Sequence, residues 1–140
     1  MPVESTTPDL VELTRSIWVA VNRQDWDAVG SFFAPNAFWD MSAIGLGTFE
    51  GPTALRGFWE DWVSSYEELV SEVGQVLDLG DGVVFAVIRQ QGRMTGSTGS
   101  VQVQAGWVYK WVNGMVARIT IYLDMDEARA AAERLAEERE

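Results

Sequence analysis

The sequence contains neither histidine nor cysteine. These absences exclude a Ser-His-Asp triad, a thiol nucleophile, a histidine general base, a disulfide, and a zinc site of the usual nitrogen and sulfur type. Any proton transfer must therefore use Asp, Glu, Tyr, Lys or Arg. Carboxylates alone could still bind a metal, but the chain has no Asp-x-Asp-x-Asp calcium loop. We expect neither a metal nor a cofactor.

Basic residues are also scarce. Ten Lys and Arg stand against 21 Asp and Glu, which gives a net charge of −11. Binding to nucleic acid needs a basic face, so we expect no nucleic-acid partner. No apolar run approaches the length of a membrane span, and the N-terminal stretch MPVESTTPDLVE is acidic rather than a basic leader. The sequence therefore predicts a cytoplasmic protein with no membrane partner.

The chain does have enough apolar material for one packed core. Its 140 residues suit a single domain, and 47% of them are hydrophobic, including seven Trp. This composition excludes disorder for the bulk of the chain. We predict one domain over residues 1–140, with a flexible start at residues 1–8.

Hydrophobic periodicity predicts helices first and strands afterwards. A helix opens at Pro8-Asp9, a second short one covers residues 26–33, and a third starts at Gly51-Pro52-Thr53. A short strand at residues 38–41 and a Gly-rich loop at residues 45–51 separate the second and third helices. Longer strands are predicted at residues 69–77, 83–91, 101–112 and 115–123, and a C-terminal helix at residues 125–140. Short turn-like joins between the strands favour an α+β fold with an antiparallel sheet and helices on one of its faces.

The last two predicted strands alternate in polarity. Their odd positions are mostly apolar, and their even positions are mostly polar. The odd set includes Val101, Val103, Trp107, Tyr109, Trp111, Ile119, Ile121 and Leu123, and the even set includes Gln102, Gln104, Lys110, Arg118, Thr120 and Tyr122. We expect the odd face to point inward and the even face to meet water or a second subunit.

Three short motifs occur in a recognisable order. They are Phe33-Ala34-Pro35-Asn36-Ala37, the helix start Gly51-x-x-Ala54-Leu55-x-x-Phe58, and Tyr122-Leu123-Asp124. In this order they resemble the SnoaL-like family of the nuclear transport factor 2 superfamily, over about residues 10–135. Relatives include ketosteroid isomerases, limonene epoxide hydrolases and polyketide cyclases. The resemblance implies a cone-shaped, strongly curved antiparallel sheet packed on three N-terminal helices, with a cavity inside. It also implies a homodimer formed through the sheet.

Asp40 is the first candidate for a catalytic residue. It shares a predicted strand face with Phe38, so both side chains line the cavity if one does. Aromatic neighbours would then raise its pKa and make it a usable general base. By resemblance, ketosteroid isomerases carry a catalytic Asp at or beside this position. The alternative is that Asp40 caps the loop at residues 42–47 by accepting backbone N–H bonds, which would lower its pKa.

Arg89 is the second candidate. It lies on the odd face of its strand, together with Gln91, where a positive charge could polarise a ligand carbonyl. The alternative is a structural ion pair at the rim of the sheet. By resemblance, epoxide hydrolases of this fold carry two further acids, and this chain has Gln91 and Ile121 at those positions instead. Ketosteroid isomerases need a Tyr on the first helix, and this chain has Ile17 in the matching region.

Several large side chains are candidates for a ligand-binding wall. They are Phe38, Trp59, Trp62, Gln91, Trp107, Tyr109, Ile119 and Ile121. The alternative is that the aromatic residues fill an ordinary core. Two function classes follow. The first is a cofactor-free isomerase, cyclase, or epoxide or lactone hydrolase that acts on a small hydrophobic molecule, with Asp40 as base and Arg89 or Tyr109 as electrophilic partner. The second is a non-catalytic domain of the same fold that binds a ligand or a partner chain.

Overall fold

The structure is a computed structural model that describes residues 9–94, 96 and 99–137. The predicted flexible start at residues 1–8 and the end of the predicted C-terminal helix, residues 138–140, lie outside these ranges. The elements follow in the order α1 (Leu10–Asn22), α2 (Trp26–Ser31), β1 (Phe33–Asp40), the short 3-10 helix η2 (Ser42–Ile44), β2 (Thr48–Glu50), α3 (Pro52–Ser64), β3 (Tyr66–Gly80), β4 (Val83–Met94), β5 (Ser100–Val112), β6 (Met115–Tyr122) and α4 (Met125–Glu137).

The first helices begin where the sequence supplies caps. The Asp9 carboxylate accepts the backbone N–H groups of Val11 and Glu12, and the Asp25 carboxylate accepts that of Ala28. These bonds satisfy N–H groups that have no partner within a helix. The third helix, α3, starts with Pro52, whose fixed φ suits a first helical position.

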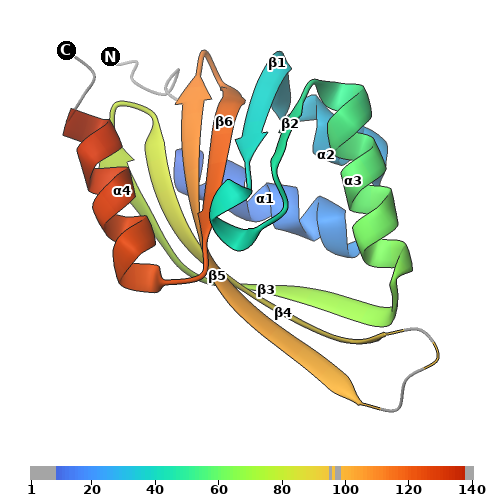
Figure 1. Cartoon of the computed structure of the whole chain (residues 1–140). Helices are drawn as coiled ribbons and strands as arrows, with labels where there is room; N and C mark the ends of the chain where they lie inside the picture. Colours follow the sequence, from blue (N-terminus) through green and yellow to red (C-terminus); the bar gives the residue numbers. More distant parts are fainter. Residues whose placement is uncertain (1–8, 95, 97–98, 138–140) are drawn as a thin grey trace.

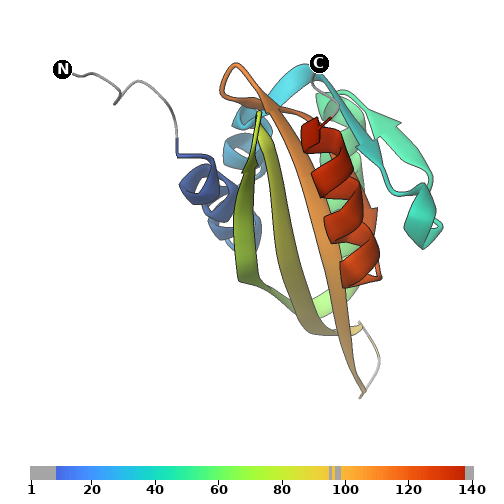
Figure 2. The ribbon, with the colours of Figure 1, turned by 90° about the vertical axis from the view of Figure 1, so that its left-hand side faces the viewer.

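The six strands form one sheet in the order β2-β1-β6-β5-β4-β3. Neighbouring strands are antiparallel, except that β1 and β6 run parallel. The sheet bends strongly, with α1, α2 and α3 on its concave side and α4 against the opposite face (Figures 1 and 2). This arrangement confirms the predicted α+β cone architecture.

The start of β1 is the main difference from the predicted elements. The short helix α2 ends at Ser31, and the strand begins at Phe33 rather than at residue 38. The N–H of Val116 donates to the Phe32 carbonyl over 2.8 Å, which draws the segment into the sheet beside β6. The ladder is then irregular before Phe38, where Pro35 has no N–H to donate. The predicted Gly-rich loop contains one more short strand, β2.

The pairing register decides which residues face inward. Trp107 lies opposite Ile121 and Tyr109 lies opposite Ile119, so these odd residues of β5 and β6 share one face, and all four are buried. The predicted inward odd face is therefore confirmed. Ala86 also lies opposite Trp107, so the even residues of β4 share this inner face. Trp39 lies opposite Ile119, which places the odd residues of β1 there as well.

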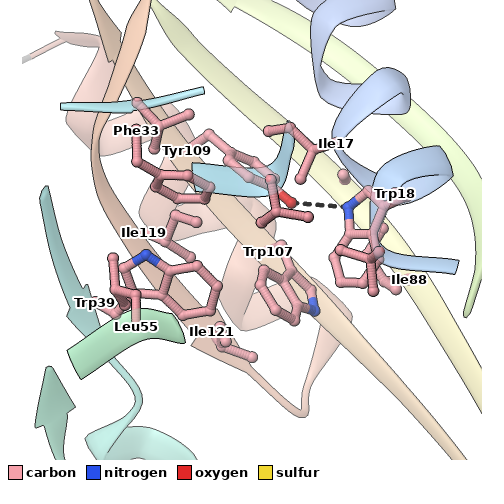
Figure 3. Close-up of a cluster of buried hydrophobic side chains, with 14 of the residues drawn as sticks. Ile17, Trp18, Phe33, Trp39, Leu55, Ile88, Trp107, Tyr109, Ile119 and Ile121 are labelled. Atoms are coloured by element: carbon pink, nitrogen blue, oxygen red, sulfur yellow. Dashed lines mark hydrogen bonds between the residues drawn. The ribbon is translucent and has the colours of Figure 1, made fainter. Parts of the chain in front are cut away.

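An aromatic cluster fills the deep part of the cone. Trp18, Trp39, Trp59 and Trp107 are each at least 94% buried. Trp18 and Trp39 each contact both Trp59 and Trp107 edge to face. The Trp18 indole N–H donates to the hydroxyl of Tyr109 over 2.9 Å (Figure 3). Burial raises the pKa of Tyr109 well above its ordinary value. This phenol is therefore a neutral, structural member of the core.

A second, smaller cluster lies under α4 on the outer face of the sheet. Ala128 and Ala132 of the helix are buried there against sheet residues that point away from the cone. The sheet side comprises Val83, Phe85 and Val108, with Leu77, Leu79, Val87 and Tyr122 partly buried around them. The outer face was predicted to meet water or a second subunit, and α4 covers part of it instead. Among the described residues, no helix has the length and apolar composition needed to cross a bilayer.

Candidate functional site

The narrow end of the cone is packed, but a small apolar cavity remains at its mouth. The cavity has a volume of about 50 Å³. Roughly 10–15 Å³ is enough for one water molecule, so there is room for a small group. Its lining comes from the loop around η2, from α3 and from the inner face of β4, β5 and β6. The lining residues are Met41, Ile44, Leu46, Phe58, Trp59, Trp62, Ile88, Gln90, Val103, Ala105, Trp107, Ile121 and Leu123.

Local backbone contacts hold the loop that forms one wall. The N–H of Met41 donates to the Gly47 carbonyl over 2.8 Å, and the N–H of Leu46 donates to the Met41 carbonyl over 3.0 Å. Gly45 and Gly47 adopt positive φ angles of 83° and 79°, which side-chain-bearing residues rarely adopt. The tight loop places Ile44 and Leu46 at the opening of the cavity.

The mouth exposes apolar side chains to solvent. Leu46 is 39% exposed and Leu123 is 57% exposed, and both line the cavity. Phe58 and Trp62 of α3 stack against each other on the same rim, with ring centroids 5.9 Å apart. An apolar rim beside an apolar cavity favours the binding of a hydrophobic molecule.

None of the described residues that line this cavity is titratable. Gln90 is the one polar residue among them apart from the indole N–H groups of the tryptophans. General acid–base catalysis needs a titratable group within hydrogen-bonding reach of the reacting atom. The cavity wall does not supply one.

Four of the predicted ligand-binding residues line the cavity. They are Trp59, Trp62, Trp107 and Ile121. Tyr109 and Ile119 lie on the same inner face but are fully buried in the aromatic core, next to Trp18 and Trp39 (Figure 3). The structure thus brings together part of the predicted wall and assigns Tyr109 and Ile119 to packing.

The predicted position of Asp40 and Phe38 in the cavity is wrong. They do share one face, but it is the outer face, because Trp39 between them is fully buried in the cone. Phe38 lies opposite Arg118 in the parallel ladder, with the Arg118 guanidinium carbon 5.1 Å from the centre of the Phe38 ring. Arg118 also approaches the Asp40 carboxylate to 3.6 Å.

Asp40 has the environment of a loop cap. Its carboxylate accepts hydrogen bonds from both the backbone N–H and the hydroxyl of Ser42, at the start of η2. These two bonds, with help from the charge of Arg118, lower the pKa of Asp40 below its ordinary value despite its partial burial. A carboxylate with a lowered pKa is a weak proton acceptor, so the geometry favours the capping alternative over the general base.

The predicted position of Arg89 and Gln91 on the cavity wall is also wrong. Both occupy odd positions of β4, which face outward because the even positions face the cone. Arg89 pairs with Glu72 over 2.9 Å and donates to the Gln104 side chain over 3.3 Å. This is the ion pair of the alternative interpretation. Arg89 and Gln91 line an open groove of about 580 Å³ on the outer face.

Sequence reasoning missed much of the cavity wall. The missed residues are Met41, Ile44, Leu46, Phe58, Ile88, Gln90 and Ala105, whereas Val103 and Leu123 belong to the predicted inward face. The alternation of β4 carried a usable signal, since Val84, Ala86 and Ile88 are apolar and precede Gln90 at the same spacing. Among the described residues, no three acidic side chains come together as a metal site would require.

The sequence matches a family model over most of its length. The model is that of the SnoaL-like domain, and it matches residues 14–119. The chain belongs to the SnoaL-like family. Among curated proteins, none is similar enough to this SnoaL-like chain to count as a match.

Solved structures share the SnoaL-like cone. A hypothetical protein with a ketosteroid isomerase-like fold from Catenulispora acidiphila DSM 44928, in complex with trimethylamine, is 17% identical, with a TM-score of 0.72 over 86% of this chain and 92% of that chain. A candidate polyketide cyclase from Xanthomonas campestris pv. campestris is 22% identical, with a TM-score of 0.66 over 86% and 94%. The epoxide hydrolase/cyclase-like enzyme SalBIII of salinomycin pyran ring formation is 21% identical, with a TM-score of 0.69 over 82% and 90%. At these identities the similarity establishes the fold alone.

Proposed function

We propose that this SnoaL-like chain binds a small, uncharged hydrophobic molecule at the mouth of its cone, without using a side chain of the cavity as acid or base. The observation that carries the proposal is the composition of the wall, in which apolar side chains surround one amide and the indole groups. An ionised ligand would lose its hydration there without gaining an opposite charge.

The size of the cavity limits how the ligand enters. A volume of about 50 Å³ accepts one small ring or one alkyl branch. The rest of the ligand would lie in the open mouth, between Leu46 and Leu123. The aromatic rings of Phe58, Trp59 and Trp62 offer flat surfaces on which a ring can pack.

The outer groove supports a ligand site less well. Its two arginines are already paired, Arg89 with Glu72 and Arg93 with Glu68, and the groove is open to solvent. Surface ion pairs of this kind are worth little and do not by themselves indicate a ligand. The loop-capping role of Asp40 likewise removes the base that the acid–base mechanism requires.

Thermal unfolding with the neutral hydrocarbon p-xylene tests the proposal. A ligand that binds only the folded chain raises its stability, by about 2.7 kcal/mol at a hundredfold excess over Kd. We expect p-xylene to raise the Tm of the wild-type chain. We expect no increase for Ala105→Leu, in which a larger side chain fills the cavity.

The control is Val70→Leu, which also enlarges an apolar side chain but at an exposed position on the outer face. It should keep the response of the wild-type chain. The proposal fails if the wild-type Tm does not respond, or if Ala105→Leu responds as strongly as the wild-type chain.

A further inference from the structure

Gln90 introduces one amide into an otherwise apolar wall. It lies on the inner face of β4, two residues beyond the buried Ile88, and it lines the cavity at the cone mouth. A polar group on such a wall is costly unless it has a hydrogen-bonding partner. The hydrogen-bonding partners of the Gln90 amide therefore indicate which ligand groups the wall can bind.

A short chain of hydrogen bonds fixes the Gln90 amide. Its Nε2 donates to the hydroxyl of Ser71, which lies opposite it on β3, over 3.0 Å. Ser71 is 95% buried, and Asn22 at the end of α1 holds its backbone on both sides. The Asn22 amide donates to the Ser71 carbonyl and accepts the Ser71 N–H, each over 2.8 Å.

This arrangement leaves hydrogen-bonding capacity on the cavity wall. With Nε2 bound to Ser71, the carbonyl oxygen Oε1 of Gln90 has no donor among the residues that the structure describes. Trp59 lines the same cavity and is 98% buried, and within the described part of the chain its indole N–H has no acceptor. The Gln90 acceptor is therefore unused, and a ligand hydroxyl group can donate to it.

We propose that Gln90 is a specificity-determining residue that selects neutral ligands bearing a hydroxyl group over hydrocarbons of the same shape. This inference rests on the proposed function, since it concerns the same cavity. Ser71 acts as a positioning residue, because it holds the amide from behind. The ligand hydroxyl donates to Oε1 of Gln90.

The test compares p-cresol with p-xylene, which differ by a hydroxyl in place of a methyl group. The phenol stays neutral at pH 7, because its pKa is near that of Tyr, about 10. A net hydrogen bond is worth about 1 kcal/mol, so we expect the wild-type chain to bind p-cresol roughly five- to tenfold more tightly. In heteronuclear NMR spectra, p-cresol should shift the side-chain amide signals of Gln90 and the indole signal of Trp59.

Three variants locate the selectivity. Gln90→Met keeps the shape of the side chain and should bind both probes equally. Ser71→Ala releases the amide and should lose part of the preference for p-cresol. The matched control is Gln91→Met, whose side chain faces outward on the next position of the strand. It should keep the full preference.

The outcomes separate this inference from the proposed function. If the wild-type chain binds both probes equally, or if Gln90→Met keeps the preference for p-cresol, the role of Gln90 is refuted while the cavity stands. If neither probe binds, or if Ala105→Leu binds both as the wild-type chain does, the proposed function itself is refuted.

Discussion

Asp40 shows how one residue changes role with the direction of its side chain. On the inner face it would be a desolvated base, whereas on the outer face its carboxylate holds the loop by accepting the N–H and the hydroxyl of Ser42. We predict that Asp40→Ala lowers the stability by roughly 1 kcal/mol or less, which is about 2–4 °C in Tm. Asp40→Asn, which keeps an acceptor, should lower it less. Neither variant should change the binding of p-xylene. A loss of binding would mean that Asp40 contributes to the ligand site.

The pH dependence of the Asp40 contribution follows from the direction of its pKa shift. The folded pKa is lowered below its ordinary value of 3.8, so the stabilising effect is complete above that value. It is lost as the pH falls through the folded pKa. The Tm difference between the wild-type chain and Asp40→Asn should therefore be present at pH 6 and shrink below pH 3.8 in calorimetric scans. A difference that grows on acidification would contradict the capping role.

At the scale of elements, the contact between α4 and the sheet depends on a glycine. A Cβ atom on Gly106 would clash with the Cβ of Ala128 and press on the ring of Phe85. Overpacking of this kind typically costs about 1–3 kcal/mol. We predict that Gly106→Ala loses stability in that range and that amide exchange in α4 becomes faster.

The control for this element is Gly74→Ala on β3. A Cβ there would meet the Val87 carbonyl oxygen at 3.5 Å, which is ordinary van der Waals contact. Denaturant titrations of both variants give the comparison. If Gly106→Ala unfolds at the same denaturant concentration as Gly74→Ala, α4 is not packed on the sheet as closely as the structure places it.

The strands also show which features of the site could be read from the sequence. Alternation along β5 and β6 correctly placed Trp107 and Ile121 inward, because one face is apolar and the other polar. Alternation alone could not place Arg89, since apolar residues occupy both faces of β4, one side toward the cone and the other toward α4. Only the register, with Ala86 opposite Trp107, decides between the two faces.

The same limit applies to β1. Phe38 and Trp39 are both apolar but point to opposite faces of β1, and the pairing of β1 with the distant strand β6 determines which of them faces inward. Order and type of most elements, by contrast, depend on local periodicity and caps, and these were predicted correctly. The cone architecture could be predicted from the resemblance to the family. The faces on which Asp40 and Gln90 lie could not, because they depend on pairing between strands that are distant in the sequence.

For the whole molecule, we expect a homodimer formed through the part of the outer face that α4 leaves open. Acidic Glu68 and Glu72 lie on β3 beside basic Arg89 and Arg93 on β4, and Val70 between the acids is 59% exposed. A two-fold axis parallel to the strands would place Glu68 and Glu72 of each copy over Arg89 and Arg93 of the other.

Sedimentation velocity measures this assembly directly. The wild-type chain should sediment as a dimer at micromolar concentration, and Arg89→Glu should shift it toward monomer. Lys110 also lies on the outer face, but it is paired with Asp81 away from this groove. Lys110→Glu is therefore a charge-matched control that should leave the dimer intact. A wild-type monomer would end this hypothesis.

We propose above all that a neutral hydrophobic ligand occupies the mouth of the cone. Intermolecular nuclear Overhauser effects from p-xylene to the methyl groups of the chain test it most directly. We predict contacts to Ile88, Val103 and Ile121, which line the cavity, and none to Val70 on the outer face. Contacts to Val70 without contacts to the three cavity residues would contradict the account and place the ligand in the outer groove.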